Sequence, residues 1–187
     1  MKPAVLLDRD GTIIHEVSYL DRVELIEFFP WTTDTIRALN RAGFPVVVVT
    51  NQPGIARGFF DEALVGAVHR EITSRLALGG ATIDAYYHCP HHPEGTVAAF
   101  ARVCDCRKPA CGLAERAARE MGLDLRRSYV VGDRWKDIGL ARAVGARGIL
   151  VRTGSGRLEE LRPSSDLSAD AVVDNLAAAA SWILTNR

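Results

Sequence analysis

The sequence has no excess of charge of either sign, because 23 lysines and arginines are balanced by 23 aspartates and glutamates. Proteins that bind nucleic acid or an anionic membrane by neutralising phosphates carry a basic excess, so the composition argues against both partners. No run approaches 18 apolar residues, and we expect no transmembrane helix. The N-terminal segment MKPAVLLDRDG is too short in apolar residues for a signal peptide, which predicts a cytoplasmic protein.

Cysteine is scarce, with four residues in a chain of 187. In a cytoplasmic protein a structural disulfide is not expected, so clustered cysteines favour metal binding or chemistry. The composition is not that of a disordered chain, because 48% of the residues are hydrophobic and the net charge is zero. A chain of this length can bury one sizeable core, and we expect residues 1–187 to form a single domain.

Short apolar runs alternate with helical segments along the chain. The runs at 4–7, 45–49, 83–87, 128–131, 148–151 and 171–173 predict strands that are buried on both faces. Helices are predicted at 33–41, 62–78, 113–121, 137–144 and 176–184, with Asp61 and Asn175 as candidate N-caps. This alternation predicts an α/β sandwich around a parallel sheet, with a surface loop at 162–165.

Polar residues follow several of the predicted strands. In open parallel sheets, ligands bind outside the carboxyl ends of the strands, so these residues are expected at one edge of the sheet. Each residue alone is also typical of a turn or a helix cap, but together they predict a site. They are Asp8 and Asp10 after the first strand, Thr50, Asn51 and Gln52 after the second, Asp133 and Asp137 after the fourth, and Lys108 in the loop before a helix.

The segment LLDRDGT brings two carboxylates to the end of the first strand. A turn at Gly11 would let Asp8 and Asp10 face the same site. Two carboxylates held together repel each other and need a cation or a shared proton, and Mg²⁺ is the expected hard, oxygen-binding ion. A carboxylate can also attack phosphorus to form an aspartyl-phosphate, while a second carboxyl acts first as an acid and then as a base.

Four motifs, in this order, resemble those of the haloacid dehalogenase superfamily of phosphatases. They are DRDGT at 8–12, Thr50-Asn51, Lys108, and GDRWKD at 132–137. The resemblance spans about residues 4–152 and implies a Rossmann-like three-layer sandwich with a mostly parallel sheet, bound Mg²⁺ and a phospho-aspartate intermediate. Because no large insertion separates the motifs, we expect no cap domain.

The resemblance also implies a role for each matching residue. Asp8 would be the nucleophile and Asp10 the general acid and base. Thr50 and Lys108 would hold the phosphoryl group that is transferred. Asp133 would bind Mg²⁺ together with the Asp8 carboxylate and the Asp10 backbone carbonyl.

A second group of residues has the composition of a zinc site. Cys89 and His91 form one close pair, and Cys104 and Cys106 form another, within a loop at about 88–111. Three thiols and one imidazole are a tetrahedral zinc set, and with all four positions filled by protein the ion would be structural. His92 is an alternative ligand, and a set of incidental thiols in a loop is the other interpretation.

The loop at about 88–111 indicates which family within the superfamily the sequence resembles most. The segments 50–58, 87–95 and 104–109 resemble the heptose bisphosphate phosphatases, whose pattern implies His91 rather than His92 as the ligand and leaves Cys111 over. The related histidinol-phosphate phosphatases have a shorter loop than the fourteen residues between Cys89 and Cys104. A small sugar phosphate is therefore the expected substrate, and the zinc would restrain Lys108, which follows the second pair.

Without a cap domain, loops would bind the substrate. Arg107 and Arg134 suit a second phosphate, because guanidinium groups bind phosphate oxygens in pairs. Asp137, one helical turn beyond Asp133, is expected to orient the site. We expect a monomer, and a catalytically inactive, zinc-stabilised binding module on the same fold is the alternative of another class. The loop residues expected to contact substrate are Glu16, Val17, Ser18, Tyr19, Asn51, Gln52, Pro53 and Arg107.

Overall fold

Six parallel strands form the central sheet of the computed structural model, which describes residues 1–162 and 166–186. The strand order is β3-β2-β1-β4-β5-β6, so the chain starts in the middle of the sheet and builds outward in both directions. The parallel sheet is therefore confirmed. The strands are β1 (Val5–Leu7), β2 (Val46–Asn51), β3 (Ala85–Cys89), β4 (Tyr129–Gly132), β5 (Arg147–Val151) and β6 (Ala171–Val173).

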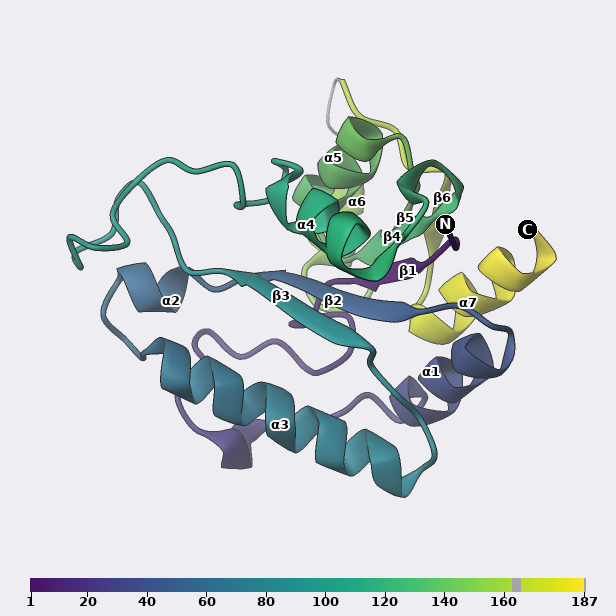
Figure 1. Cartoon of the computed structure of the whole chain (residues 1–187), viewed down its shortest axis with the longest axis horizontal. Helices are drawn as coiled ribbons and strands as arrows, with labels where there is room; N and C mark the ends of the chain where they lie inside the picture. The colour runs from purple at the N-terminus through teal and green to yellow at the C-terminus, as the bar shows by residue number, and fades with distance from the viewer. Residues whose placement is uncertain (163–165, 187) are drawn as a thin grey trace.

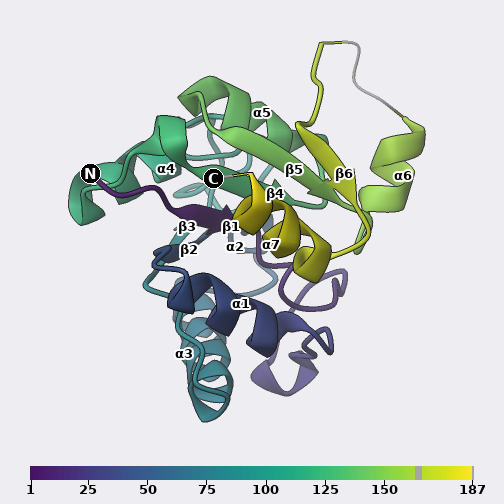
Figure 2. The ribbon, with the colours of Figure 1, turned by 90° about the vertical axis from the view of Figure 1, so that its right-hand side faces the viewer.

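Helices cover both faces of the sheet and make three layers (Figures 1 and 2). One face carries α1 (Thr32–Arg41), α3 (Glu62–Leu78) and α7 (Leu176–Thr185), and the other carries α4 (Gly112–Met121) and α5 (Trp135–Val144). The shorter elements are α2 (Pro53–Ala56), α6 (Gly156–Leu161) and the 3-10 turns η1 (Val23–Leu25) and η2 (Leu125–Arg127).

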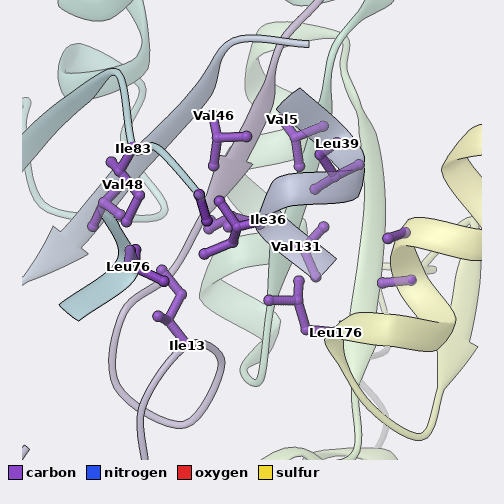
Figure 3. Close-up of a cluster of buried hydrophobic side chains, with 14 of the residues drawn as sticks. Val5, Ile13, Ile36, Leu39, Val46, Val48, Leu76, Ile83, Val131 and Leu176 are labelled. Carbon is purple, nitrogen blue, oxygen red and sulfur yellow. The ribbon is translucent and has the colours of Figure 1, made fainter. Parts of the chain in front are cut away.

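The inner strands β1, β2 and β4 are buried along their whole length because each face of the sheet has its own core. The edge strands β3 and β6 are only partly buried, so the predicted burial on both faces is wrong for these two. Val5 and Leu7 of β1 pack on the side of α1, α3 and α7, whereas Leu6 packs on the side of α4 and α5. Figure 3 shows the first core, where Ile36 of α1 and Leu176 of α7 meet the strands. This double burial explains why the sequence shows continuous apolar runs and no alternation.

The five predicted helices are present, and both predicted N-caps are formed. Asp61 accepts a hydrogen bond from the Leu64 amide at 2.9 Å, and Asn175 accepts one from the Ala178 amide at 3.0 Å. Helix α5 begins at Trp135, two residues earlier than expected, because Asp137 accepts a hydrogen bond from the backbone of Arg134 and so lies inside the first turn.

The carboxyl ends of β1, β2 and β4 meet at one edge of the sheet, where the polar segments follow them. The loop at 90–111 leaves β3 at the same edge (Figure 1). Between β1 and α1 the chain forms only η1, so no separate domain covers this edge in the part of the chain that is described. Residues 163–165 of the predicted surface loop lie outside the described residues.

No helix within residues 1–162 and 166–186 is both long enough and apolar enough to cross a membrane.

Candidate active site and candidate metal centre

Lys108 connects two buried carboxylates at the edge of the sheet. Its Nζ lies 2.9 Å from Asp8 Oδ1 and 2.6 Å from Asp137 Oδ1. Burial alone would raise the pKa of Asp8, but the positive charges of Lys108 and Lys136 outweigh it and lower that pKa. Burial opposes the charge of Lys108, yet Asp137 and Asp8 raise its pKa. Asp8 is therefore an ionised carboxylate beside a charged ammonium group.

Asp133 is fully buried and only partly satisfied. Its Oδ2 accepts a hydrogen bond from the Ser155 amide at 2.7 Å, while Oδ1 has no hydrogen-bond partner among the described residues. Burial, with the Asp8 and Asp137 carboxylates, raises the pKa of Asp133 from 3.8 to about 8. One oxygen from each of these three carboxylates lies within 4.8 Å of the others. Two lysines do not balance three carboxylates, and the unpartnered, buried oxygen of Asp133 fits a hard divalent cation such as Mg²⁺.

Two glycines make room for Asp133. Gly11 has a φ of +79°, and a Cβ there would lie 2.4 Å from Asp133 Oδ2. At Gly154, whose φ is +54°, a Cβ would lie 2.3 Å from the same oxygen. The predicted turn at Gly11 is therefore present, and any side chain at either position would displace the carboxylate.

Asp10 is held from two sides. Arg9 Nε lies 3.2 Å from Oδ1 and 3.1 Å from Oδ2, and Arg9 Nη2 lies 3.0 Å from Oδ1. Gln52 Nε2 donates to Asp10 Oδ2 at 2.9 Å and to Thr50 Oγ1 at 2.9 Å. The ends of β1 and β2 are thus joined by side chains of the predicted site.

Both polar atoms of the Asn51 side chain form hydrogen bonds with the backbone of Lys108. Asn51 Nδ2 donates to the Lys108 carbonyl at 3.1 Å, and the Lys108 amide donates to Asn51 Oδ1 at 2.9 Å. Asn51 still lies at the wall of the cavity, but its polar atoms are already engaged. Its predicted contact with substrate stays a prediction.

A cavity of about 290 Å³ opens above these groups. Arg57 and Lys136 also lie in its wall, and neither was given a role from the sequence, although both lie within segments that carried the resemblance, at 50–58 and 132–137. Arg57 Nη1 donates to the Tyr19 hydroxyl at 2.6 Å. The predicted residues that line it are Asp8, Asp10, Glu16, Val17, Ser18, Tyr19, Thr50, Asn51, Gln52, Pro53, Arg107 and Arg134.

The charged residues in the cavity wall differ in how they are paired. Arg134 Nη2 lies 2.6 Å from Glu16 Oε1, and Ser155 Oγ donates to Glu16 Oε2 at 3.1 Å. Arg107 Nη1 donates to the His91 carbonyl at 3.3 Å, which leaves its charge uncompensated by a carboxylate among the described residues.

The candidate metal centre lies beside this cavity. The ligand atoms of Cys89, His91, Cys104 and Cys106 all lie within 4.8 Å of one another. The Sγ atom of Cys106 is 3.0 Å from that of Cys89, 3.3 Å from that of Cys104 and 3.2 Å from His91 Nδ1. Three thiols and an imidazole gathered this closely fit a soft-to-borderline tetrahedral ion such as zinc.

The two neighbouring candidates for this centre are occupied elsewhere. His92 Nδ1 accepts the Glu94 amide at 3.1 Å, and its Nε2 contacts Arg57 at 3.4 Å. Cys111 precedes α4, where a hydrogen bond with Glu115, together with burial, raises the pKa of its thiol. The structure therefore brings together the set that contains His91 and leaves Cys111 out.

Comparison with known proteins agrees with this geometry. Residues 105–179 match the HAD-hydrolase-like family. The chain is 42% identical over 177 residues to the D-glycero-beta-D-manno-heptose-1,7-bisphosphate 7-phosphatase of Escherichia coli K12, covering 94% of this chain and 90% of that protein. It is 42% identical over 190 residues to the D-glycero-D-manno-heptose-1,7-bisphosphate 7-phosphatase of Thermosynechococcus vestitus, covering 99% and 97%.

A solved structure shows the same likeness. The D,D-heptose 1,7-bisphosphate phosphatase of B. bronchiseptica, complexed with magnesium and phosphate, superposes with a TM-score of 0.87 at 33% identity and covers 100% of both chains. The family model and the solved structure identify the chain, with its carboxylates and lysine at the carboxyl edge of a parallel sheet, as a HAD-like hydrolase. Within that class, the chain belongs to the family of the D-glycero-D-manno-heptose-1,7-bisphosphate 7-phosphatases.

Proposed function

We propose that this protein is a Mg²⁺-dependent phosphatase that removes the 7-phosphate of D-glycero-D-manno-heptose 1,7-bisphosphate and releases heptose 1-phosphate. The single observation that carries the proposal is the Asp8 carboxylate in the cavity wall, 2.9 Å from Lys108 Nζ and with an oxygen within 4.8 Å of one of Asp133. The names of the relatives support the substrate. The reaction would serve the formation of ADP- or GDP-heptose, in a cytoplasmic, monomeric enzyme whose whole chain acts as one domain.

The reaction would proceed through an aspartyl-phosphate on Asp8. Asp8 Oδ1 accepts the Arg9 amide at 2.8 Å and faces Lys108, so we assign the attack on phosphorus to Oδ2. Lys108 and the Thr50 hydroxyl would hold the oxygens of the phosphoryl group. Asp10 would give a proton to the leaving oxygen and would then take one from the water that hydrolyses the intermediate.

Mg²⁺, when bound by Asp8, Asp133 and the Asp10 carbonyl, would supply positive charge to the phosphoryl oxygens. The residues around it have their own tasks. Asp137 lies 2.6 Å from the ammonium group of Lys108 and would orient the site through it. The fully buried position of these groups keeps bulk water away from the charges and strengthens their interaction.

The second phosphate of the substrate would lie at the wall that carries the cations. Arg107 and Arg134 were both expected to bind it. Arg134 already pairs with Glu16, whereas the charge of Arg107 faces no carboxylate among the described residues. Arg57, which donates to the Tyr19 hydroxyl, adds another cation at this wall that pairs with no carboxylate among the described residues. We therefore expect Arg107 to contribute more than Arg134 to binding the second phosphate.

A structural zinc ion would be held by Cys89, His91, Cys104 and Cys106. This proposal is supported by the close approach of the three sulfur atoms and one ring nitrogen. All four positions of a tetrahedral ion would be filled, which leaves none for water or substrate. Because Arg107 and Lys108 follow Cys106 directly, the ion would restrain the segment that supplies cations to the cavity.

Phosphate release from a panel of substrates tests the function. The panel contains heptose 1,7-bisphosphate, histidinol phosphate and fructose 1,6-bisphosphate, each with Mg²⁺. We expect the highest kcat/KM for the heptose bisphosphate. A preference for histidinol phosphate would overturn the proposed substrate, and release from none of a wider sugar-phosphate set would favour an inactive zinc-stabilised binding module.

A further inference from the structure

Arg9 is a buried cation that no step described above uses. Its side chain is 2% exposed, and it lies beside Asp10, which is 24% exposed. Nε and Nη2 both face the Asp10 carboxylate, whereas Nη1 has no hydrogen-bond partner among the described residues. A guanidinium group is seldom buried for packing alone, because taking it out of water is costly unless its hydrogen bonds are well used. Here they are used on a single carboxylate.

Two-point contact of this kind fixes a carboxylate in a way that a point charge does not. Arg9 Nε is 3.2 Å from Oδ1 and 3.1 Å from Oδ2, so the guanidinium faces both oxygens of Asp10. The planar donors of arginine therefore restrict both the position of the carboxylate and its rotation.

Gln52 provides a second restraint from the neighbouring strand. Its Nε2 donates to Asp10 Oδ2 and to Thr50 Oγ1, each at 2.9 Å. Its own backbone amide donates to the Cys89 carbonyl at 2.8 Å, which fixes the backbone from which the Gln52 side chain reaches Asp10 and Thr50. Asp10 is thereby tied to the hydroxyl that we assign to the phosphoryl group.

We propose that Arg9 and Gln52 are positioning residues that hold the Asp10 carboxyl at the cavity floor for proton transfer to the leaving oxygen. The proposal rests on the proposed function, in which Asp10 is the proton donor. In that step the O–H bond of Asp10 breaks and the proton goes to the leaving oxygen. At the same time the bond from phosphorus to that oxygen breaks, and the bond from phosphorus to Asp8 forms. Proton transfer needs the two oxygens within hydrogen-bond reach, so a freely rotating Asp10 would be a poor donor.

Substrates with different leaving groups separate this role from a structural one. p-Nitrophenolate leaves without a proton, whereas the alkoxide of a sugar phosphate needs one. We would measure kcat/KM, which reports the first phosphoryl transfer, for p-nitrophenyl phosphate and heptose 1,7-bisphosphate. The variants are Arg9→Met, Arg9→Lys, Gln52→Leu and Asp10→Asn, with Arg75→Met as a control that removes a partly buried arginine paired to Glu71.

We expect Arg9→Met to lose at least tenfold more kcat/KM on the sugar phosphate than on the aryl phosphate. Gln52→Leu should also lose more kcat/KM on the sugar phosphate than on the aryl phosphate, but by a smaller factor. Arg9→Lys should lose less kcat/KM than Arg9→Met, and Arg75→Met should leave kcat/KM unchanged for both substrates. In the Asp10→Asn background, Arg9→Met should add no further loss that depends on the leaving group. Thermal unfolding of each variant shows whether it is folded, and Gln52→Leu carries the test if Arg9→Met is not.

Equal losses on both substrates in folded Arg9→Met and Gln52→Leu would overturn the proposal and leave Arg9 with a structural role. The Asp10→Asn variant separately tests the proposed function on which this proposal rests. If Asp10→Asn lost activity equally on both substrates, Asp10 would not be the proton donor, and the premise would fail before Arg9 is considered.

Discussion

Asn51 holds the backbone of Lys108 in both directions, donating to its carbonyl at 3.1 Å and accepting from its amide at 2.9 Å. This pair joins the end of β2 to the loop that follows the Cys/His cluster. The Lys108 ammonium in turn lies between Asp8 and Asp137. The position of a buried cation at the reacting group therefore depends on one side-chain amide, in addition to any metal in the loop.

Replacing Asn51 with alanine should lower kcat by about 10- to 100-fold, because a displacement of about 1 Å at a catalytic group has effects of this size. Asn51→Asp keeps the acceptor for the Lys108 amide and loses the donor to its carbonyl, so its loss should be smaller. Steady-state kinetics measure both. Asn40 is a matched control, since it makes the same two-way pair with the backbone of Thr82 away from the cavity. Unchanged kcat in Asn51→Ala would contradict this role.

Asp133 should make the stability of the metal-free protein depend on pH. Its folded pKa is raised from 3.8 to about 8, so its contribution is fully present below about pH 4 and is lost as the pH rises to 8. Adding Mg²⁺ should restore stability most strongly at the upper end of this range. Thermal unfolding with a chelator and with Mg²⁺, from pH 5 to 8, measures the effect.

Asp133→Asn should flatten this pH dependence, remove most of the stabilisation by Mg²⁺ and abolish turnover. Asp34→Asn is the control, because Asp34 is an exposed carboxylate on α1. The wild-type protein should lose activity with a chelator and regain it with Mg²⁺. Full activity after exhaustive chelation would exclude the proposed metal.

Elemental analysis should find about one zinc per chain. Cys104→Ser and Cys89→Ser should lower the zinc content, the stability and, through disorder at Lys108, the activity. Structural zinc in small peptides contributes roughly 10–16 kcal/mol of apparent binding, so its loss should disorder the loop and leave the two apolar cores in place. Cys111→Ser is the matched control and should change none of the three. Metal-free protein that is as active and as stable as zinc-loaded protein would argue against the site.

Arg107→Gln should raise KM for the bisphosphate more than Arg134→Gln does. The reason is that Arg134 is already paired with Glu16, while the charge of Arg107 is free to meet a phosphate. The KM for a sugar monophosphate should change little in either variant. Arg116→Gln, an exposed pair with Glu120, is the control. Equal KM increases on mono- and bisphosphate would show that Arg107 does not contact the second phosphate.

The parts of this fold that the sequence predicts are those with a strong local cause. The inner strands β1 and β4 are continuous apolar runs because both of their faces are buried, and Asp61 and Asn175 cap their helices as expected. Helices α2 and α6, of four and six residues, are too short to show an apolar period. The end of β2 lies at Asn51, beyond the predicted end, because its pairing with β3 continues to Cys89.

The site shows the same division. The residue types that carry chemistry, such as Asp8, Lys108 and Cys104, could be chosen from spacing and resemblance. The partners that position these residues could not be predicted from the sequence, because they come from segments that are far apart in the chain. The pairing of Arg134 with Glu16 joins residues 118 positions apart, and that of Asn51 with Lys108 joins residues 57 apart. No local pattern encodes such pairs.

The most direct test of the central claim is the turnover of Asp8→Asn on heptose 1,7-bisphosphate, with deamidation excluded by mass spectrometry. An amide cannot form the phospho-enzyme, so a folded Asp8→Asn protein should lose nearly all activity, while wild-type protein quenched during turnover should carry a phosphate on the peptide that contains Asp8. Appreciable turnover by undeamidated Asp8→Asn would contradict the covalent mechanism.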